Sequence, residues 1–391
     1  MLNEWLLTKQ ILHLNHGSFG ATPRVVLAEQ SRWRELFQAD PTTFVVDRWE
    51  PSLDHARESL CRVVGANPES LGFVPNTTTG VNAVLRSFPF AAGDEILTTN
   101  HVYNACRNVL EFVAAESEAE LVIAPVPFPL SSADEVVAAI MEKVSPRTRF
   151  ALLDHVTSAT GLVLPVDRLV PLLEGLGVAV MVDGAHAPGM VELDIESLAP
   201  SYYAGNCHKW LCAPPGSAFL WVRPDRADRV VPTVISHGAN DPRTDRPRLH
   251  LLFDYPGTID PSGYLSVPTA IEFLTSLHPQ GLEGVMASNR DLALAARDYL
   301  CEVVGTPPPA PDDMIGSLAA VILPPGEGQA PIGFIDPLTR VLLEQWGIQV
   351  PVFIWPSWPA RDLRVSAAPY NQFDDYLKLS AALAAELSRA A

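Results

Sequence analysis

The sequence of 391 residues has little positive charge. Its 27 lysine and arginine residues stand against 45 aspartate and glutamate residues, which gives a formal net charge of −18. No run of basic residues occurs along the chain. Because nucleic acids and anionic membrane surfaces are bound through clustered lysine and arginine, we expect neither as a partner. An anionic ligand must then be held by local donors and helix N-termini, not by the overall charge of the protein.

Signals for export and membrane insertion are also missing. Residues 1–10 lack the basic region and apolar core of a secretory signal. No uninterrupted apolar run is long enough to span a membrane. The five cysteines are odd in number and scattered, which favours reduced thiols. They are Cys61, Cys106, Cys207, Cys212 and Cys301. The sequence therefore predicts a cytoplasmic protein without membrane contact.

The chain is rich in apolar residues, which make up 48% of the sequence, and its length predicts two domains. Short apolar segments alternate with amphipathic ones through the first 222 residues. Strands are expected at 70–74, 95–99, 121–124, 150–153, 178–182, from 202 and at 218–222, with helices at 53–64, 81–88, 105–115, 133–144 and 167–176. This alternation predicts an α/β fold with a mostly parallel sheet covered on both faces.

A second, smaller α/β domain is expected after residue 260. Residues 236–264 are rich in Arg, Asp, Pro and Gly, and indicate a surface excursion that serves as a dimer contact or a mobile flap. Helices are then expected at 266–277, 283–304, 337–346 and 373–388, and strands at 318–323, 349–354 and 362–366. We divide the chain into an N-terminal segment (1–22) near the active site, a large domain (23–260) and a C-terminal domain (261–391).

Two reactive side chains follow apolar strands of the large domain. Asp183 ends the strand at 178–182, and Lys209 follows the strand that begins at Tyr202. A pyridoxal 5'-phosphate (PLP) site needs this pair, because a lysine amine forms a Schiff base with the cofactor aldehyde and a carboxylate keeps the pyridine nitrogen protonated. A lysine after a histidine is also compatible with a solvated loop, so the rest of the chain has to decide.

A phosphate site is expected at the turn 75–80, which carries three consecutive threonines and a glycine between a strand and a helix. The unpaired N–H groups and the dipole of a helix N-terminus favour an anion, and Thr78 is the expected hydroxyl donor. A plain helix cap is the alternative. Polar side chains follow five strands at the edge where such sheets bind ligands. They are residues 76–79, Tyr103, residues 155–158, 183–186 and 206–209.

Two further segments are candidates for substrate contact. The polar, glycine-containing turn at 13–20 places Asn15 and His16 near the site. Residues 40–50 mix aromatic and charged side chains without a clear period, and indicate a loop in which Phe44 and Arg48 select the substrate.

The clusters, in this order, resemble the class V aminotransferase family of fold-type I PLP enzymes, over nearly the whole chain. Within that family they are most similar to isopenicillin N epimerase-like proteins, which are related to the cysteine desulfurases. The resemblance is carried by Asn-His-Gly-Ser-Phe-Gly at 15–20, Ser-Ala-Thr-Gly-Leu-Val-Leu-Pro at 158–165, Val-Asp-Gly-Ala-His-Ala-Pro-Gly at 182–189 and Gly-Asn-Cys-His-Lys-Trp-Leu at 205–211. These motifs are specific for the fold and cofactor and much less so for the reaction.

The resemblance implies a role for each matching residue. Lys209 is the Schiff-base lysine, Asp183 the partner of the pyridine nitrogen, and Tyr103 the aromatic ring that stacks on the cofactor. His186 and Ser158 match positions near the ring or its phenolic oxygen. The positions that match phosphate contacts are Thr77, Thr78, Asn206 and His208.

The resemblance also implies a homodimer with shared active sites and an amino-acid substrate. Gly257 and Thr258 match a segment that reaches the cofactor phosphate of the neighbouring subunit. Arg364 matches the arginine that binds the substrate carboxylate. Taken alone, Arg364 is also compatible with a structural ion pair and Tyr103 with a core aromatic. No metal is expected.

Several reactions share the loss of the α-proton. Reprotonation from the opposite face gives an epimerase or racemase, which we place first. Elimination gives a C–S lyase of the cysteine lyase or hercynylcysteine sulfoxide lyase type, and reprotonation at the cofactor gives an aminotransferase. A persulfide-forming desulfurase is disfavoured, because residues 352–361 contain no cysteine. A non-catalytic binding protein on the same fold is the alternative from another class.

Overall fold

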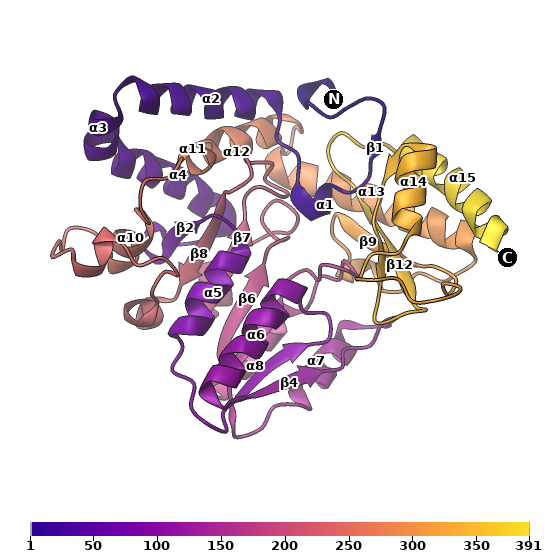
Figure 1. Ribbon diagram of the computed structural model, residues 1–391, viewed down its shortest axis with the longest axis horizontal. Helices are drawn as coiled ribbons and strands as arrows, with labels where there is room; N and C mark the ends of the chain where they lie inside the picture. Colours follow the sequence, from indigo (N-terminus) through magenta and orange to yellow (C-terminus); the bar gives the residue numbers. More distant parts are fainter. Residues whose placement is uncertain (1, 391) are drawn as a thin grey trace.

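The computed structural model describes residues 2–390, and its centre is a seven-stranded sheet (Figure 1). The strand order is β2-β8-β7-β6-β5-β3-β4. The strands are β2 (Leu71–Val74), β3 (Glu95–Thr99), β4 (Glu120–Ala124), β5 (Thr148–Asp154), β6 (Ala179–Gly184), β7 (Tyr202–Asn206) and β8 (Ala218–Val222). Only β8 runs antiparallel to its neighbours, so the other six strands end at the same edge. The predicted α/β class with a mostly parallel sheet is confirmed.

Helices cover both faces of this sheet, so alternate residues of the central strands belong to two separate cores. Phe150 and Leu152 of β5 pack in one core with α5 (Thr77–Ser87) and α6 (Asn104–Ser117). Ala151 and Leu153 pack in the other core with α4 (Trp49–Val64), α7 (Ala133–Met141) and α8 (Val166–Gly175). Strands that are buried on both faces read as continuous apolar runs, which explains why the sequence predicts them well.

The C-terminal part forms a second sheet of three antiparallel strands, in the order β11-β12-β9. These are β9 (Leu318–Ile322), β11 (Val352–Ile354) and β12 (Arg361–Ser366). The long helix α13 (Gly281–Val304) packs on β9 and on the terminal helix α15 (Phe373–Ala390), and α14 (Leu338–Trp346) precedes the short strand β10 (Ile348–Gln349). Figure 1 shows this unit beside the large sheet.

The N-terminal segment is attached to the C-terminal unit. Strand β1 (Leu12–His13) pairs in parallel with β10, and the Ser366 amide donates to the Leu14 carbonyl at 3.1 Å. In α1 (His16–Phe19) the Gly17 amide donates to Ser366 Oγ at 3.1 Å. A Cβ at Gly17 would lie 2.6 Å from Leu318 Cδ2, so a larger residue here would require the Leu318 side chain to shift.

The segment 40–50 is helical, which corrects the expected loop. It continues α2 (Arg24–Ala39) through α3 (Pro41–Thr43) and a π-helical turn (Phe44–Arg48) into α4. Phe44 is buried, with its ring 5.3 Å from the Phe37 ring and 6.5 Å from the Trp49 ring. Aromatic residues without an obvious period here form a core contact, so the mixed pattern does not indicate a surface loop.

Two element boundaries also differ from the prediction. Helix α5 begins at Thr77 and not at residue 81, because Asn76 caps it by accepting from the Thr79 amide at 2.9 Å. The expected strand at 349–354 is two short strands in different sheets, β10 and β11, on either side of Val350 and Pro351. Proline cannot donate a backbone hydrogen bond to a strand ladder.

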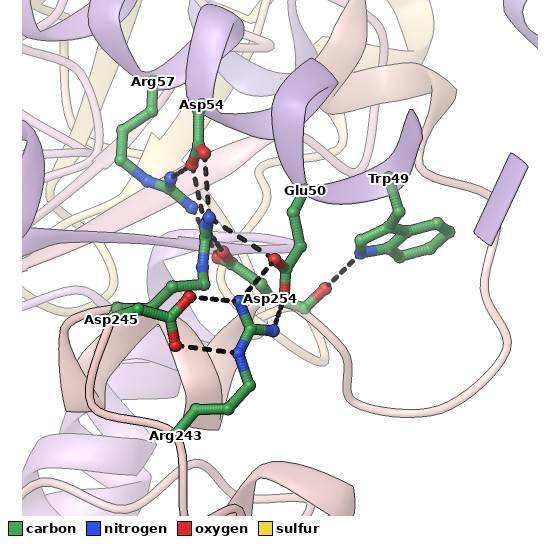
Figure 2. Close-up of polar contacts among 8 residues, drawn as sticks. Trp49, Glu50, Asp54, Arg57, Arg243, Asp245 and Asp254 are labelled. Atoms are coloured by element: carbon green, nitrogen blue, oxygen red, sulfur yellow. Dashed lines mark hydrogen bonds and ion pairs between the residues drawn. The ribbon is translucent and has the colours of Figure 1, made fainter. Parts of the chain in front are cut away.

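Residues 236–247 are largely at the surface, as expected, but residues 249–254 are buried. Helix α10 (Arg248–Phe253) is buried against β2. Figure 2 shows the charge network that attaches this segment to α4: Arg243 pairs with Glu50 at 2.8 Å, and Arg57 pairs with Asp254 at 2.6 Å. The expected mobile flap is therefore wrong for 248–254, while the dimer contact stays a prediction.

The remaining helical elements are short. They are α9 (Ile195–Leu198), α11 (Ser262–Leu265), α12 (Val267–Ser276) and 3₁₀ turns at Leu2–Glu4, Pro68–Ser70, Pro224–Arg229, His237–Asn240 and Asp312–Met314. All five cysteines are buried and free. None of the helices within residues 2–390 has the length and apolar character needed to cross a membrane. The domain boundaries at 22/23 and 260/261 stay predictions.

Candidate active site

Asp183 and Lys209 meet at the edge where the parallel strands end. Asp183 is the second-last residue of β6, and Lys209 follows the neighbouring strand β7. The Lys209 turn is fixed by two amides, those of Cys207 and His208, which donate to the Ser217 carbonyl at 3.0 and 3.2 Å. A Cβ at Gly20 would lie 1.9 Å from the His208 carbonyl oxygen, so glycine at this position lets the N-terminal segment close over the turn.

The Asp183 carboxylate is buried and held by two donors. The Ala185 amide donates to Oδ1 at 3.0 Å, and the Cys106 thiol donates to Oδ2 at 3.1 Å. Burial raises the pKa of Asp183, while these hydrogen bonds and the Lys209 charge act in the opposite direction. The carboxylate is therefore fixed in orientation but short of a strong cationic partner.

A second buried carboxyl, Asp154, lies opposite Asp183 in the register of β5 and β6. Burial, and then the charge of Asp183, raises the pKa of Asp154 well above its usual value. Its Oδ2 has no hydrogen-bond partner within residues 2–390. Two adjacent carboxyls in a buried site cannot both ionise, so Asp154 holds the proton and Asp183 is the group available to carry the charge.

Lys209 contacts His186, whose tautomer is set by Trp210. Trp210 Nε1 donates to His186 Nδ1 at 3.3 Å, so a neutral His186 carries its proton on Nε2. His186 Nε2 lies 3.0 Å from Lys209 Nζ, which must then accept with a lone pair. Burial, and then the charge of Arg364, lowers the pKa of Lys209 to about 8. Burial also lowers the pKa of His186 well below its usual value. The contact favours an uncharged amine.

The N-terminus of α5 lies at the same edge and has free donors. Asn206 Oδ1, at the end of β7, accepts from the Thr77 amide at 2.9 Å and from its hydroxyl at 3.0 Å. Neither the amide nor the hydroxyl of Thr78 donates to another group in the described part of the chain. His208 Nδ1 contacts the Ser217 carbonyl at 2.9 Å, which leaves Nε2 for a ligand. This helix end suits a phosphate.

Arg364 is a buried cation without an acidic partner. It donates to Asn15 Oδ1 at 3.1 Å, to Ser18 Oγ at 2.9 Å and to the Ser158 carbonyl. Its Nε has no partner, and it forms no ion pair within residues 2–390. Burial lowers the pKa of Arg364 to about 10. The predicted alternative of a structural ion pair is therefore wrong, and a carboxylate ligand would supply the missing charge.

Tyr103 lines a cavity of about 270 Å³, whose other lining residues come from both units. The residue caps α6 and is 46% exposed, so the alternative of a core aromatic is wrong. Burial of part of the ring raises the pKa of the phenol. Ser158 lines the same cavity.

The structure places other expected site residues elsewhere. His16 is buried, with Nε2 3.0 Å from the Lys209 carbonyl and Nδ1 3.0 Å from Tyr370 Oη, and burial lowers its pKa to about 4. Both ring nitrogens are used within the chain, so His16 supports the lysine turn. Phe44 packs in the core, which corrects its expected substrate contact. Among residues 2–390, no hydrogen bond or ion pair joins Arg48, Gly257 or Thr258 to the other site residues, so their roles stay predictions.

Sequence reasoning missed four contributors: Cys106, Asp154, Trp210 and Ser18. For three of them the sequence contained a signal. Asp154 ends a predicted strand as Asp183 does, Trp210 is next to Lys209, and Ser18 lies in the turn with Asn15. Cys106 had no signal, because a cysteine on a predicted helix gives no indication of which side chain it faces.

These side chains fit PLP on their own chemistry. The site offers a fixed carboxylate, a neutral amine, unpaired donors at a helix N-terminus and an unpaired guanidinium at one edge of the sheet. Those are the groups that a cationic ring, an aldehyde, a phosphate and a substrate carboxylate require.

Comparisons with known proteins give the same picture. Residues 27–312 match the family described as aminotransferase class-V. The chain is 34% identical to the isopenicillin N epimerase of Streptomyces clavuligerus, over 97% of this chain and 95% of that protein. It is 27% identical to the L-cysteine desulfhydrase of Arabidopsis thaliana, over 95% of this chain and 87% of that protein.

A solved structure shows the same fold. It is a lysine-to-alanine mutant of C-DES with glycine covalently linked to the PLP cofactor, and it aligns with a TM-score of 0.80 and 21% identity. The alignment covers 98% of this chain and 99% of that one.

Proposed function

Because the chain belongs to the aminotransferase class-V family, we propose that it is a PLP-dependent enzyme that removes the α-proton of an amino acid and adds a proton to Cα on the opposite face. The observation that carries the proposal is the contact of Lys209 with His186, which favours a neutral amine at a site that also holds a fixed carboxylate and an unpaired guanidinium. The 34% identity to an isopenicillin N epimerase over nearly the whole chain supports our choice of epimerisation as the first candidate.

PLP bound at this site supplies an aldehyde that condenses with amino groups and a ring that accepts the electron pair released at Cα. Asp183 is the carboxylate that would hold a proton at the ring nitrogen, because Cys106 and the Ala185 amide fix its orientation. The phosphate donors would be Thr78, Asn206 and His208.

Lys209 acts as the base. A lysine with a pKa of about 8 is neutral in a useful fraction near pH 7, so it can take the α-proton. His186 donates to the amine through Nε2 and so opposes its protonation in the resting protein. Arg364 binds the substrate carboxylate and fixes the direction of the Cα–H bond.

The return of the proton needs an acid on the other face, and we assign it to Tyr103. The raised pKa of its phenol keeps the group protonated at neutral pH, and the residue borders the substrate cavity. Tyr103→Phe should therefore slow racemisation while leaving α-proton removal measurable.

A second candidate is elimination of a sulfur group. The 27% identity to an L-cysteine desulfhydrase favours it, and residues 352–361 contain no cysteine that would form a persulfide. This reaction needs the same base but no acid on the opposite face.

One experiment separates these outcomes. The purified protein, loaded with PLP, is incubated with amino acids in D₂O and followed by NMR and chiral chromatography. Deuterium at Cα with loss of chirality supports the epimerase. Pyruvate with released sulfide supports the lyase, and a keto acid supports an aminotransferase. Lys209→Ala should abolish all of them, and Lys378→Ala, at an exposed lysine, should abolish none. Absence of every product across the panel, with PLP bound, leaves a non-catalytic binding protein.

We also propose a homodimer in which each chain completes the site of the other. Thr258 is exposed and contacts only Tyr255 Oη, at 3.2 Å, among side-chain groups of the described residues. Light scattering gives the mass directly. Thr258→Val should weaken PLP binding in a dimer, and mixing with Lys209→Ala should give hybrid dimers with partial activity. A monomeric, fully active protein would reject this proposal.

A further inference from the structure

The cavity beside Arg364 is lined by aromatic rings from both units. Tyr103 precedes α6 in the large unit, and Phe334, Phe353 and Trp355 come from the C-terminal unit. The lining contains no lysine, arginine, aspartate or glutamate from residues 2–390. A charged substrate side chain would lose its hydration here without gaining an opposite charge.

His101, the only titratable ring base in this lining, is held neutral. Its Nδ1 contacts Thr160 Oγ1 at 2.9 Å, and its Nε2 contacts the Val126 carbonyl at 3.2 Å. Burial lowers the pKa of His101 to about 4, and its ring lies 4.4 Å from that of Trp355. The cavity wall is therefore uncharged at neutral pH.

Two residues of the cavity lining contact Arg364. The Arg364 guanidinium lies 5.0 Å from the centroid of the Phe353 ring and donates to the Ser158 carbonyl. Phe353 and Ser158 both line the cavity. An amino acid held by its carboxylate on Arg364 would thus lie next to this lining, with Phe353 as the adjacent aromatic ring.

Phe334 is positioned to cover that side chain. Its carbonyl accepts from the Ile354 amide at 2.8 Å, which fixes the backbone against the edge of β11. Its own ring is 62% exposed. A bulky apolar group in the cavity would bury this ring, whereas a side chain the size of cysteine would leave it and most of the cavity in water.

We infer that the substrate is an amino acid with a large, uncharged, aromatic or heteroaromatic side chain, and that Phe334 helps to select it. This inference rests on the proposed function, because it places the reacting amino acid on Arg364. The amides of Asn104 and Asn108, which also line the cavity, are available for a neutral polar atom on the ring.

The test compares L-phenylalanine and L-tryptophan with L-alanine, L-cysteine, L-lysine and L-aspartate in the holoenzyme. Exchange of the Cα proton in D₂O gives kcat and KM for each. We expect a KM at least about tenfold lower for the aromatic amino acids than for L-alanine, the order that a filled apolar pocket provides. Phe334→Ala should raise the KM for L-phenylalanine about tenfold and leave kcat and the KM for L-alanine unchanged.

The matched control is Ile332→Ala, a fully exposed apolar residue of the same loop outside the cavity lining. It should change neither KM. Equal KM values across the panel, or an equal effect of Phe334→Ala on alanine and phenylalanine, would overturn the inference while leaving the proposed function in place.

A binding measurement separates the two proposals. Saturation-transfer NMR on the PLP-loaded Lys209→Ala protein, in which no turnover is expected, reports contact with the amino-acid side chain, and Cα exchange is measured separately on the wild-type protein. Preferential binding of aromatic amino acids without any Cα exchange would support the inference and reject the proposed function. Exchange with preferred binding of small or charged amino acids would do the reverse.

Discussion

The pKa of Lys209 gives a prediction that needs no substrate. Burial, with the Arg364 charge, lowers this pKa from 10.5 to about 8. Between these two values the fraction of neutral amine at pH 7 differs roughly 300-fold. The reactivity of Lys209 toward an acylating reagent should therefore rise about tenfold per pH unit up to about pH 8 and then level off.

The chain itself provides the reference for this assay. It contains four lysines, Lys9, Lys143, Lys209 and Lys378, so a proteolytic digest followed by mass spectrometry resolves each one. The apoprotein is labelled at a series of pH values, and the pH of half-maximal labelling is read for Lys209, with the exposed Lys9 and Lys378 in the same samples. Slow access to a buried amine lowers the plateau but does not move this midpoint. A midpoint at or above pH 10 for Lys209 would refute the reasoning.

The role of Trp210 can be tested in the same assay. Trp210→Phe removes the donor to His186 Nδ1, so a neutral His186 is free to carry its proton on either nitrogen. Lys209 can then donate to His186 Nε2, which favours the charged amine, and the midpoint should move to higher pH. The control is Trp346→Phe, which removes an indole that donates to Glu386 on the surface, at 3.0 Å. An unchanged midpoint in Trp210→Phe would show that the lowered pKa of Lys209 does not depend on the tautomer of His186.

Three further predictions concern other groups of the site. The raised pKa keeps Asp154 protonated in the folded protein, whereas the unfolded chain loses this proton above about pH 4. The contribution of Asp154 therefore lowers the free energy of unfolding increasingly as the pH rises. Asp154→Asn should therefore raise the melting temperature more at pH 8 than at pH 4 and keep PLP bound. Equal changes of the melting temperature at both pH values would contradict the assignment of the proton to Asp154. Asp183→Asn, by contrast, should lower the activity strongly. Arg364→Gln should raise KM about 100-fold for an amino acid but not change the affinity for PLP measured by absorbance, because a charged hydrogen bond to the carboxylate is lost. Thr78→Val should weaken binding of PLP about tenfold and leave binding of pyridoxal, which has no phosphate, unchanged in fluorescence titrations.

The central part of the site could be predicted because its signals are local. Asp183, Lys209 and the Thr77–Thr78 turn each follow a continuous apolar strand, and the ends of parallel strands share one edge of a sheet. Burial on both faces makes such strands easy to recognise. This property of parallel sheets predicts that the residues lie close together, although it gives no distances.

The rest depended on contacts between distant segments. Cys106 meets Asp183 across 77 residues, and Arg364 meets Asn15 across 349, and no local pattern reports such a pairing. The loop predicted at 40–50 was wrong for a different reason. Phe44 and Trp49 face one core, but the π-helical turn between them breaks the period of 3.6 residues that a helix prediction requires.

The attachment of the N-terminal segment affects how the two units can move. Since β1 is a partner of β10 and Asn15 is bonded to Arg364, the first residues and the carboxylate anchor form one rigid piece. Any hinge rotation between the units would carry that anchor, with its bonds to Asn15 and Ser18, toward or away from the amine of Lys209, and would break its bond to the Ser158 carbonyl. Such a rotation must also stretch the bond from His16 to the Lys209 carbonyl, so the first residues of the chain limit the opening of the enzyme.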